Sequence, residues 1–193
     1  MDRKHWLIVL QKTGAGNSIE ILSEGKLVLS TDTYSNVYDC RIKTDGSSWS
    51  VAADTGGNSR ARQMRIVDGS AYGPFDYAGN FGYTADGKSL TFDFRKDSVS
   101  WLRLNDKEVG PYDSANVVKL PDGSYFGAVA QTKTNMYDVF IGNKKYGPFT
   151  YVNNMIDYVS ADGKDWLTRV YRNGASFLLQ NGKETPYNRI FVS

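Results

Sequence analysis

The chain has 193 residues, long enough for one domain with a sizeable core, and its 23 basic and 21 acidic residues are interspersed. A formal net charge of +2 without a basic stripe argues against a nucleic-acid-binding protein, and no apolar run is long enough to span a membrane. The single cysteine, Cys40, excludes an internal disulfide and a cysteine-rich metal site. With 13 Tyr and 19 Gly, the composition favours pleated strands joined by tight turns.

Strand patterns follow one another from the start of the chain. "HWLIVLQ" and then "EILSEGKLVL" predict a strand followed by two strands joined by a tight turn. Three later segments resemble one another: "YGPFDYAGNFGYTADGKSLTFDF" from Tyr72, "VGPYDSANVVKLPDGSYFGAVA" from Val109 and "YGPFTYVNNMIDYVSADGKDWLTRV" from Tyr146. Asp-Gly pairs and prolines recur about every 36 to 41 residues, a period typical of a repeat architecture.

The alternation of apolar residues and the turn residues in each repeat predict four short antiparallel strands. In the repeat 80–115, "FGYT" is followed by a hairpin turn at Asp86–Gly87, and then by "SLTFDF" and "VSWLRLN". Asn105–Asp106 turns the chain into a short fourth strand, "KEVG", which we expect Pro111 to end because proline has no N–H to donate. No segment shows the apolar period of a helix, so we expect almost no helix.

Four antiparallel strands with this period predict the blade of a β-propeller. Five repeats, roughly 1–36, 37–79, 80–115, 116–152 and 153–193, account for the chain as one domain. The last repeat ends in "NRIFVS" and the first lacks a first strand; joined, the two ends read "IFVSMDRKHW", similar to "DYVSADGKDW". We therefore expect a closed, all-β, five-bladed β-propeller in which the N- and C-terminal strands pair in one blade, which removes two exposed edges. The alternative is five repeats cut from a longer array.

The motifs "S-x-D-G-K-x-W" and "P-D-G-S", which follow short apolar strands, resemble the WD40-like repeats of TolB-type bacterial propellers, the PD40 type. "NGKE" followed by "PY" is similar to the form "DGKExGPYD" of related bacterial arrays. The resemblance covers nearly the whole chain, although each motif is short. It implies a bacterial propeller, periplasmic or otherwise extracytoplasmic, that serves in protein contacts, and it does not imply an enzyme.

Few side chains suit catalysis. His5 is the only histidine, so a Ser-His-Asp triad or a His-Cys zinc site lacks the groups it needs, and we expect His5 at a solvated strand end. Carboxylates near the start of first strands are the groups that a glycosidase-type enzyme would use as acid and base. They are Asp39, Asp76, Asp113 and Asp157. The same four carboxylates could instead bind a calcium ion near the propeller axis, although their spacing is not that of an EF-hand.

Recurrence favours a structural role for two of these carboxylates. Asp76 and Asp113 occupy one place in "GPFD" and "GPYD", which Thr150 takes in "GPFT" and Asn188 in "PYNR". A place shared by Asp, Thr and Asn favours a turn into the first strand. We therefore predict no catalytic residue and no metal site.

Aromatic residues in the connections between repeats give the best functional indication. Those after proline, Phe75, Tyr112, Phe149 and Tyr187, are predicted to pack between blades, as are Trp6, Trp49, Trp101 and Trp166 on strands two and three. Tyrosines with less regular positions are predicted to be exposed at the loop-rich end of the channel. The candidate ligand-binding residues are thus Tyr34, Tyr77 and Tyr151, with Asp39, Asp76, Asp113, Asp157, Asn188 and Arg189.

The sequence therefore predicts a rigid, non-catalytic binding module or scaffold without a cofactor. It is expected to be a monomer and to recognise a protein or peptide through recognition loops held by the propeller. A lectin-like propeller with one sugar site per blade is the first alternative, although the loops differ from blade to blade. A glycosidase-type enzyme is the second alternative.

Overall fold

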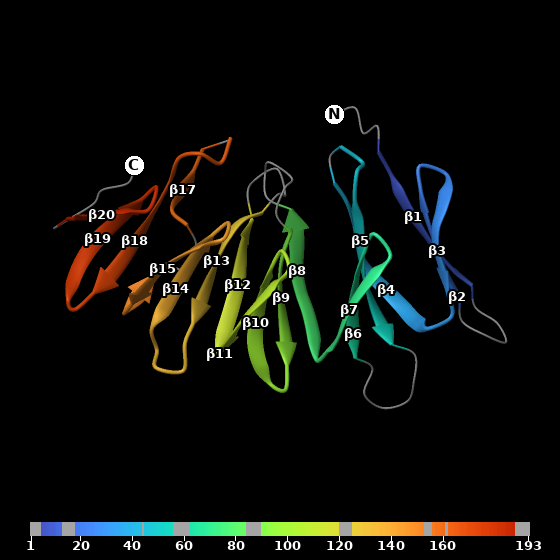
Figure 1. Cartoon of the computed structure of the whole chain (residues 1–193), viewed down its shortest axis with the longest axis horizontal. Helices are drawn as coiled ribbons and strands as arrows, with labels where there is room; N and C mark the ends of the chain where they lie inside the picture. The colour runs from blue at the N-terminus through green and yellow to red at the C-terminus, as the bar shows by residue number, and fades with distance from the viewer. Residues whose placement is uncertain are drawn as a thin grey trace. The chain divides into compact units, whose positions relative to one another are not determined.

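The structure is a computed structural model that describes residues 5–12, 18–43, 45–55, 62–83, 90–119, 125–152, 156–160 and 162–187 (Figure 1). These residues form twenty β-strands and no helix, which confirms the predicted all-β class. The strands make five antiparallel sheets in which strands consecutive along the chain pair as neighbours, with one short strand, β17, pairing beside the path in the fifth sheet.

The sheets are numbered in chain order. The first sheet contains β1 (Leu7–Lys12), β2 (Ser18–Ser23) and β3 (Lys26–Thr31), and the second contains β4 (Tyr34–Ile42), β5 (Trp49–Thr55), β6 (Gln63–Val67) and β7 (Ser70–Phe75). The third contains β8 (Tyr77–Tyr83), β9 (Leu90–Lys96), β10 (Val99–Leu104) and β11 (Lys107–Tyr112), and the fourth contains β12 (Ser114–Lys119), β13 (Tyr125–Gln131), β14 (Tyr137–Ile141) and β15 (Lys144–Phe149). The fifth contains β16 (Tyr151–Val152), β17 (Tyr158–Val159), β18 (Trp166–Arg172), β19 (Ala175–Gln180) and β20 (Lys183–Pro186).

The chain divides into two compact units, Met1–Ala78 with Arg95–Asp97, and Gly79–Phe94 with Ser98–Ser193. In the first unit, the first and second sheets share one core, made by Ile19, Ile21, Trp49, Val51, Ala53 and Ile66. In the second unit, one core joins the third and fourth sheets and another joins the fourth and fifth. Consecutive sheets within each unit therefore bury apolar faces against each other, as the predicted blades require.

The turn between strands three and four of a sheet repeats the same contacts in three sheets. The first turn residue donates its N–H to the carbonyl of the first residue of strand two, and its side-chain oxygen accepts the N–H of that residue at 2.8 Å. The pairs are Asp68 with Trp49, Asn105 with Leu90, and Asn181 with Trp166. The predicted positive φ at both central residues is confirmed at Asp68–Gly69 and Asn181–Gly182.

The Gly-Pro motifs correct one prediction. β7, β11 and β15 do not end at Pro74, Pro111 and Pro148 but continue to the aromatic residue that follows. Each is an outer strand, and the register of its ladder shifts at the Gly-Pro pair, so the bulge takes the proline out of the hydrogen-bonded ladder. The aromatic residue is buried in all three, Phe75, Tyr112 and Phe149, and the last two belong to cores between sheets, as predicted.

The four tryptophans differ in burial. Trp49 and Trp166 are 7% and 5% exposed and belong to cores between sheets, as predicted. Trp101 is half-buried and stacks on Phe94 with 6.4 Å between ring centroids. Trp6 is 43% exposed, contrary to prediction, because it lies with Ile8 and Leu10 on an exposed face of the first sheet.

The first sheet has three strands in the described part of the chain. The prediction that "NRIFVS" supplies its missing strand falls on residues 188–193, which lie outside the described residues, so ring closure stays a prediction. The second to fifth sheets each begin two or three residues before the corresponding predicted repeat. In the third to fifth sheets, strand one starts directly after the bend that follows the buried aromatic residue.

Candidate functional site

Two predicted contact tyrosines occupy the same position in their sheets. β8 begins at Tyr77 and β16 begins at Tyr151. In both sheets, the residue before the tyrosine donates its N–H to a carbonyl near the end of strand two of the same sheet. Both side chains are 47% exposed, so the prediction that they face solvent is confirmed. In the fourth sheet, Ser114 takes this position and is half-buried, so the tyrosine is not repeated in every sheet.

Tyr151 stands in a row of three tyrosine rings in the second compact unit. Its ring makes edge-to-face contacts with Tyr137 and Tyr171, with centroid distances of 6.2 and 5.5 Å. Tyr137 follows the β13–β14 connection, residues 132–136, so the row borders a loop that carries hydroxyl and amide groups. Edge-to-face packing fixes the rings, and the exposed half of Tyr151 remains available to a ligand.

Charged groups lie beside this row. The Arg172 guanidinium stands 4.8 Å from the centroid of the Phe149 ring, and it makes two hydrogen bonds to Glu184 at 3.0 and 3.1 Å. Burial and the neighbouring Tyr171 hydroxyl raise the pKa of Tyr187, which keeps that phenol neutral. This end of the fifth sheet therefore combines aromatic rings with a guanidinium held by a carboxylate.

Tyr34 differs from its prediction. It is half-buried and packs against the core between the first and second sheets. Tyr34 lies opposite Thr55, the last residue of β5, whereas Tyr151 lies opposite Tyr171, the last but one residue of β18, so the two tyrosines do not occupy the same place. The exposed tyrosine of β4 is Tyr38, whose hydroxyl donates to Asp54 at 3.1 Å. Burial of the phenol, together with the Asp54 charge, raises the pKa of Tyr38.

Asp76 and Asp113 make the same backbone bond at the bend before strand one, and the side-chain turn that their recurrence favours stays a prediction. Their N–H groups donate to the carbonyls of Arg95 and Gln131 at 2.8 and 2.9 Å, and Thr150 makes the same bond to Tyr171 at 2.7 Å. A backbone bond does not depend on the carboxylate, which explains why threonine is tolerated there. Both aspartates are exposed.

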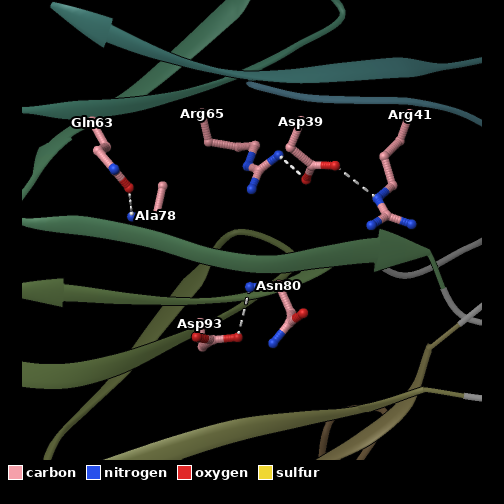
Figure 2. Close-up of polar contacts among 7 residues, drawn as sticks. All are labelled: Asp39, Arg41, Gln63, Arg65, Ala78, Asn80 and Asp93. Atoms are coloured by element: carbon pink, nitrogen blue, oxygen red, sulfur yellow. Dashed lines mark hydrogen bonds and ion pairs between the residues drawn. The ribbon is translucent and has the colours of Figure 1, made fainter. Parts of the chain in front are cut away.

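Asp39 lies within a charged group in the second sheet (Figure 2). Its Oδ2 accepts from Nη1 of Arg65 at 2.9 Å, and its Oδ1 accepts from Nε of Arg41 at 3.1 Å. Arg65 is only 1% exposed, and a buried charge is costly without a counter-charge. Asp39 therefore has a structural partner and also holds an exposed arginine.

Asp157 has a comparable partner in the fifth sheet. Its Oδ1 accepts from Nη2 and Nε of Arg169 at 2.7 and 3.2 Å, and its Oδ2 accepts the Arg169 backbone N–H at 2.8 Å. The hydrogen bonds and the charge of Asp157 raise the pKa of Arg169. Two of the four predicted carboxylates are thus each paired with an arginine of their own sheet. Asn188 and Arg189, also predicted, lie outside the described residues.

The third sheet has a buried carboxylate that the sequence did not indicate. Asp93 Oδ1 accepts the backbone N–H of Asn80 at 3.0 Å (Figure 2). A Cβ placed on Gly79 would stand 1.9 Å from Asp93 Oδ2, so only glycine leaves room for this carboxylate. In the first compact unit, Gln63 Oε1 accepts the N–H of Ala78 at 2.7 Å.

The described residues show no arrangement typical of a metal site or a membrane-spanning helix. In the described part of the chain, no three His, Cys, Asp or Glu side chains come together in a way that suits a metal ion. His5 contacts Glu24 next to the first turn, and Cys40 is a free thiol. No helix in the described ranges is long and apolar enough to cross a membrane.

Sequence reasoning missed the arginines and two of the tyrosines. Two residues separate Arg65 from the turn, as they do Leu102 and Val139 in the next two sheets, so a charge at an apolar place of the repeat was the available signal. Tyr151 lies opposite Tyr171 on β18 of the same sheet, whereas Tyr137 contacts Tyr151 from β14 of the fourth sheet, so strand pairing and packing between two sheets together form the row. The sequence motifs do not indicate which residues of two paired strands lie opposite each other.

No protein-family model matches the chain, and no curated protein sequence is similar to it. Among solved structures, the chain is similar to the uncharacterized protein lmo1340 from Listeria monocytogenes EGD-e, with a TM-score of 0.33 and 14% identity over 93% of this chain and 78% of that one. It is also similar to the β-propeller domain of Cps50 (Swd1) from Myceliophteria thermophila, with a TM-score of 0.31 and 11% identity over 93% of this chain and 68% of that one. At these values neither likeness bears on function, so we infer function from the contacts of this chain alone.

Proposed function

We propose that this chain is a non-catalytic binding module of β-propeller architecture that recognises a protein or peptide through the end of its sheets where strand one begins. The observation that carries the proposal is the exposure of Tyr77 and Tyr151 at the same strand-start position, with Tyr151 held between Tyr137 and Tyr171. Rigid tyrosine rings supply a large contact area at a small entropic cost, and nearby hydroxyl and amide groups supply adaptable hydrogen bonds.

A binding role also agrees with the state of the predicted carboxylates. Asp39 and Asp157 are paired with Arg65 and Arg169, and Asp76 and Asp113 contribute backbone bonds at bends. A glycosidase needs one carboxyl group that stays protonated and another that acts as base or nucleophile. Asp39 and Asp157 already hold the guanidinium groups of Arg65 and Arg169, so their oxygens serve ion pairs within their own sheets.

Selection from a random peptide library on the immobilised chain tests the proposal. We expect selected peptides to bind in solution, with affinity weakened about tenfold by Tyr151→Ser for peptides bound by the second unit and by Tyr77→Ser for peptides bound by the first unit, in the range of interface hot spots. Tyr158→Ser is the matched control, because Tyr158 is exposed on the same sheet but pairs near the start of β18, away from the row. Peptides that bind all three variants as tightly as the parent chain would refute this site.

The same proposal includes ring closure. Trp6 occupies the position of Trp49 and Trp166, because the carbonyl of each accepts the N–H of the turn after strand three. The face that carries Trp6, Ile8 and Leu10 is exposed, whereas the matching face of β18, with Thr168 and Val170, is buried. The opposite face of β18, with Leu167 and Arg169, is only half-buried. These two incompletely covered faces are the ones that closure brings together, and a closed ring buries both.

Small-angle X-ray scattering distinguishes a closed ring from an open array. A compact 193-residue domain has a radius of gyration of about 16 Å, and an open row of five sheets is more extended. In a closed ring, Ile8→Asn places a polar group in a core between sheets and costs about 2 kcal/mol or more in the free energy of unfolding. A larger radius of gyration together with a neutral Ile8→Asn variant contradicts closure.

A carbohydrate ligand is the second candidate, favoured by the exposed tyrosine rings themselves. The replacement of tyrosine by Ser114 in the fourth sheet argues against one equal sugar site per blade. A glycan array that gives binding abolished by Tyr151→Ser, with no peptide selected from the library, would favour this candidate.

A further inference from the structure

A β-bulge in the second sheet presents an exposed tyrosine. The register of β4 with β5 shifts between Val37 and Asp39, so Tyr38 is the extra residue of the bulge. The corresponding ladder of the fourth sheet, β12 with β13, has no shift over residues 114–118. Bulges re-aim side chains and are over-represented next to active sites. The second sheet therefore departs from a regular ladder at the residue that presents a phenol to solvent.

Asp54 is the carboxylate that this phenol contacts. It is the last residue but one of β5 and lies opposite Asn36 near the start of β4, so it stands at the end of the sheet where strand one begins. The Tyr38 hydroxyl donates to its Oδ1 at 3.1 Å, and the Asn36 amide donates to its Oδ2 at 3.4 Å. Both donors are neutral, and Asp54 forms no ion pair with the residues that the structure describes. Asp39 and Asp157, by contrast, each hold a guanidinium.

Tyr77 brings a second exposed phenol to the same end of the first compact unit. Asp54 lies opposite Gln63 on β6. The Gln63 Oε1 accepts the N–H of Ala78, the residue after Tyr77, at 2.7 Å (Figure 2). Burial raises the pKa of Tyr38, and the charges of Asp54 and of Tyr77 raise it further, so the two phenols lie within electrostatic reach of each other.

We propose that Asp54 binds a basic side chain, arginine or lysine, of a peptide that the first unit recognises, and that the rings of Tyr38 and Tyr77 contact the same side chain. The inference rests on the proposed binding function and adds the chemistry of one contact. A carboxylate forms its strongest hydrogen bonds with a cationic donor, and the faces of tyrosine rings attract cations. Hydrogen bonds from Asn36 and Tyr38 hold the carboxylate, so it loses little freedom when a cation binds.

Charge favours this occupant over others. Arg65, whose charge lowers the pKa of Tyr38, is buried and contacts Asp39 at 2.9 Å, so its charge is already engaged within the sheet. A divalent metal ion lacks ligands, because no three carboxylate, thiol or imidazole groups come together among the described residues. An acidic or phosphorylated peptide is repelled by the Asp54 carboxylate. A positive group of the ligand is the complement that remains.

NMR titration of the parent chain tests the contact without knowledge of the natural ligand. The probes are acetyl-arginine-methylamide and acetyl-lysine-methylamide at constant ionic strength, with acetyl-citrulline-methylamide as the neutral control. We expect the Asp54 carboxyl carbon and the ring protons of Tyr38 and Tyr77 to shift saturably with the arginine or lysine probe and not with the citrulline probe. Asp32, an exposed carboxylate at the bend before β4 in the same unit, should not shift saturably.

Variants separate the charge from the rings. Asp54→Asn keeps an acceptor for the Tyr38 hydroxyl and removes the charge, so the affinity of the first unit for peptides with a basic residue should fall about tenfold. Asp32→Asn is the matched control, because it removes an exposed charge from the same unit, and it should leave the affinity unchanged. Tyr38→Phe keeps the ring without the bond to Asp54 and Tyr38→Ser loses both, so binding should weaken in that order.

The inference is overturned if the citrulline probe shifts these signals as the arginine probe does, or if Asp32 responds as Asp54 does. Tighter binding of tetramethylammonium than of both basic probes would also overturn it, in favour of a small quaternary amine. Peptides that the first unit selects without a basic residue, and that bind Asp54→Asn unchanged, contradict the inference and leave the binding function intact. Saturable binding of a basic probe at Asp54 without any selected peptide gives the reverse result, in which the cation site stands and the peptide-binding function fails.

Discussion

Arg65 on β6 reaches the carboxylate of Asp39 on β4 across the intervening strand, with 2.9 Å between Nη1 and Oδ2. The pair is asymmetric, because the arginine is almost fully buried and about a quarter of the aspartate side chain, 27%, is exposed. The two ends of this contact should therefore respond differently to mutation.

Asp39→Asn should destabilise the chain more than Arg65→Leu. The asparagine variant removes the negative charge that the buried guanidinium contacts, which costs about 3 to 5 kcal/mol in the free energy of unfolding. Arg65→Leu leaves Asp39 with Arg41 and with solvent, and it places an aliphatic side chain where Leu102 lies in the third sheet, so about 1 to 2 kcal/mol is expected. Urea unfolding measures both values, and the opposite order would contradict the assigned burial.

Asn181→Ala should weaken the fifth sheet at its β19–β20 turn. The variant loses the acceptor for the Trp166 N–H and places alanine at a φ of +49°, which together cost about 2 kcal/mol. Asn181→Gly loses the same acceptor without the steric cost, so the two variants separate the side-chain bond from the backbone conformation. Equal destabilisation by the two would show that φ contributes nothing there. Faster hydrogen exchange at the Trp166 amide is expected in both.

Ser160→Ala should raise the pKa of Asp162. Hydrogen bonds from the Ser160 hydroxyl and from Lys164 lower this pKa to about 2 from the ordinary value of 3.8. Because the folded-state pKa is depressed, the stabilisation is present above the ordinary pKa and is lost as the pH falls through about 2. NMR titration of the Asp162 carboxyl carbon should give a value closer to 3.8 in the variant. Ser47→Ala, which removes the matching bond to Asp45 in the second sheet, should leave Asp162 unchanged.

Tyr112→Phe should flatten the stability profile at alkaline pH. Burial, together with the Asp138 carboxylate, raises the pKa of Tyr112 to about 12 from the ordinary 10.0. A raised pKa in the folded state gives stability that is present below the ordinary value and is lost as the pH rises towards about 12. Phenylalanine cannot ionise, so the difference between the parent chain and the variant should shrink or reverse between these values.

At neutral pH the same substitution should cost little, about 1 kcal/mol. Asp138 keeps its contact with Lys145 at 2.7 Å, and phenylalanine stands at the corresponding place in the fourth sheet as Phe149. A loss of several kcal/mol at neutral pH, or an unchanged alkaline profile, would contradict the assigned role of the hydroxyl.

Local patterns in the sequence predicted the strands and turns well. Asp68–Gly69 and Asn181–Gly182 adopt the positive φ values that their residue types favour, and alternating apolar residues form the paired strands around them. The buried aromatic residue after each Gly-Pro pair was also predicted, although Pro111 does not end its strand. A bulge on an outer strand depends on the partner strand, so it could not be read from one segment alone.

The sequence by itself determined an all-β chain of repeated meander sheets, because turn chemistry and side-chain alternation act between residues close together along the chain. Only the tertiary structure decided which charges pair, and it alone showed that Trp6 and Tyr38 are exposed and that Tyr34 is half-buried. Arg65 meets Asp39, and Tyr151 meets Tyr171, because strand register brings together residues some twenty or more positions apart. Trp6 and Trp166 occupy one place in the repeat but differ in exposure, since burial depends on the neighbouring sheet and not on the motif.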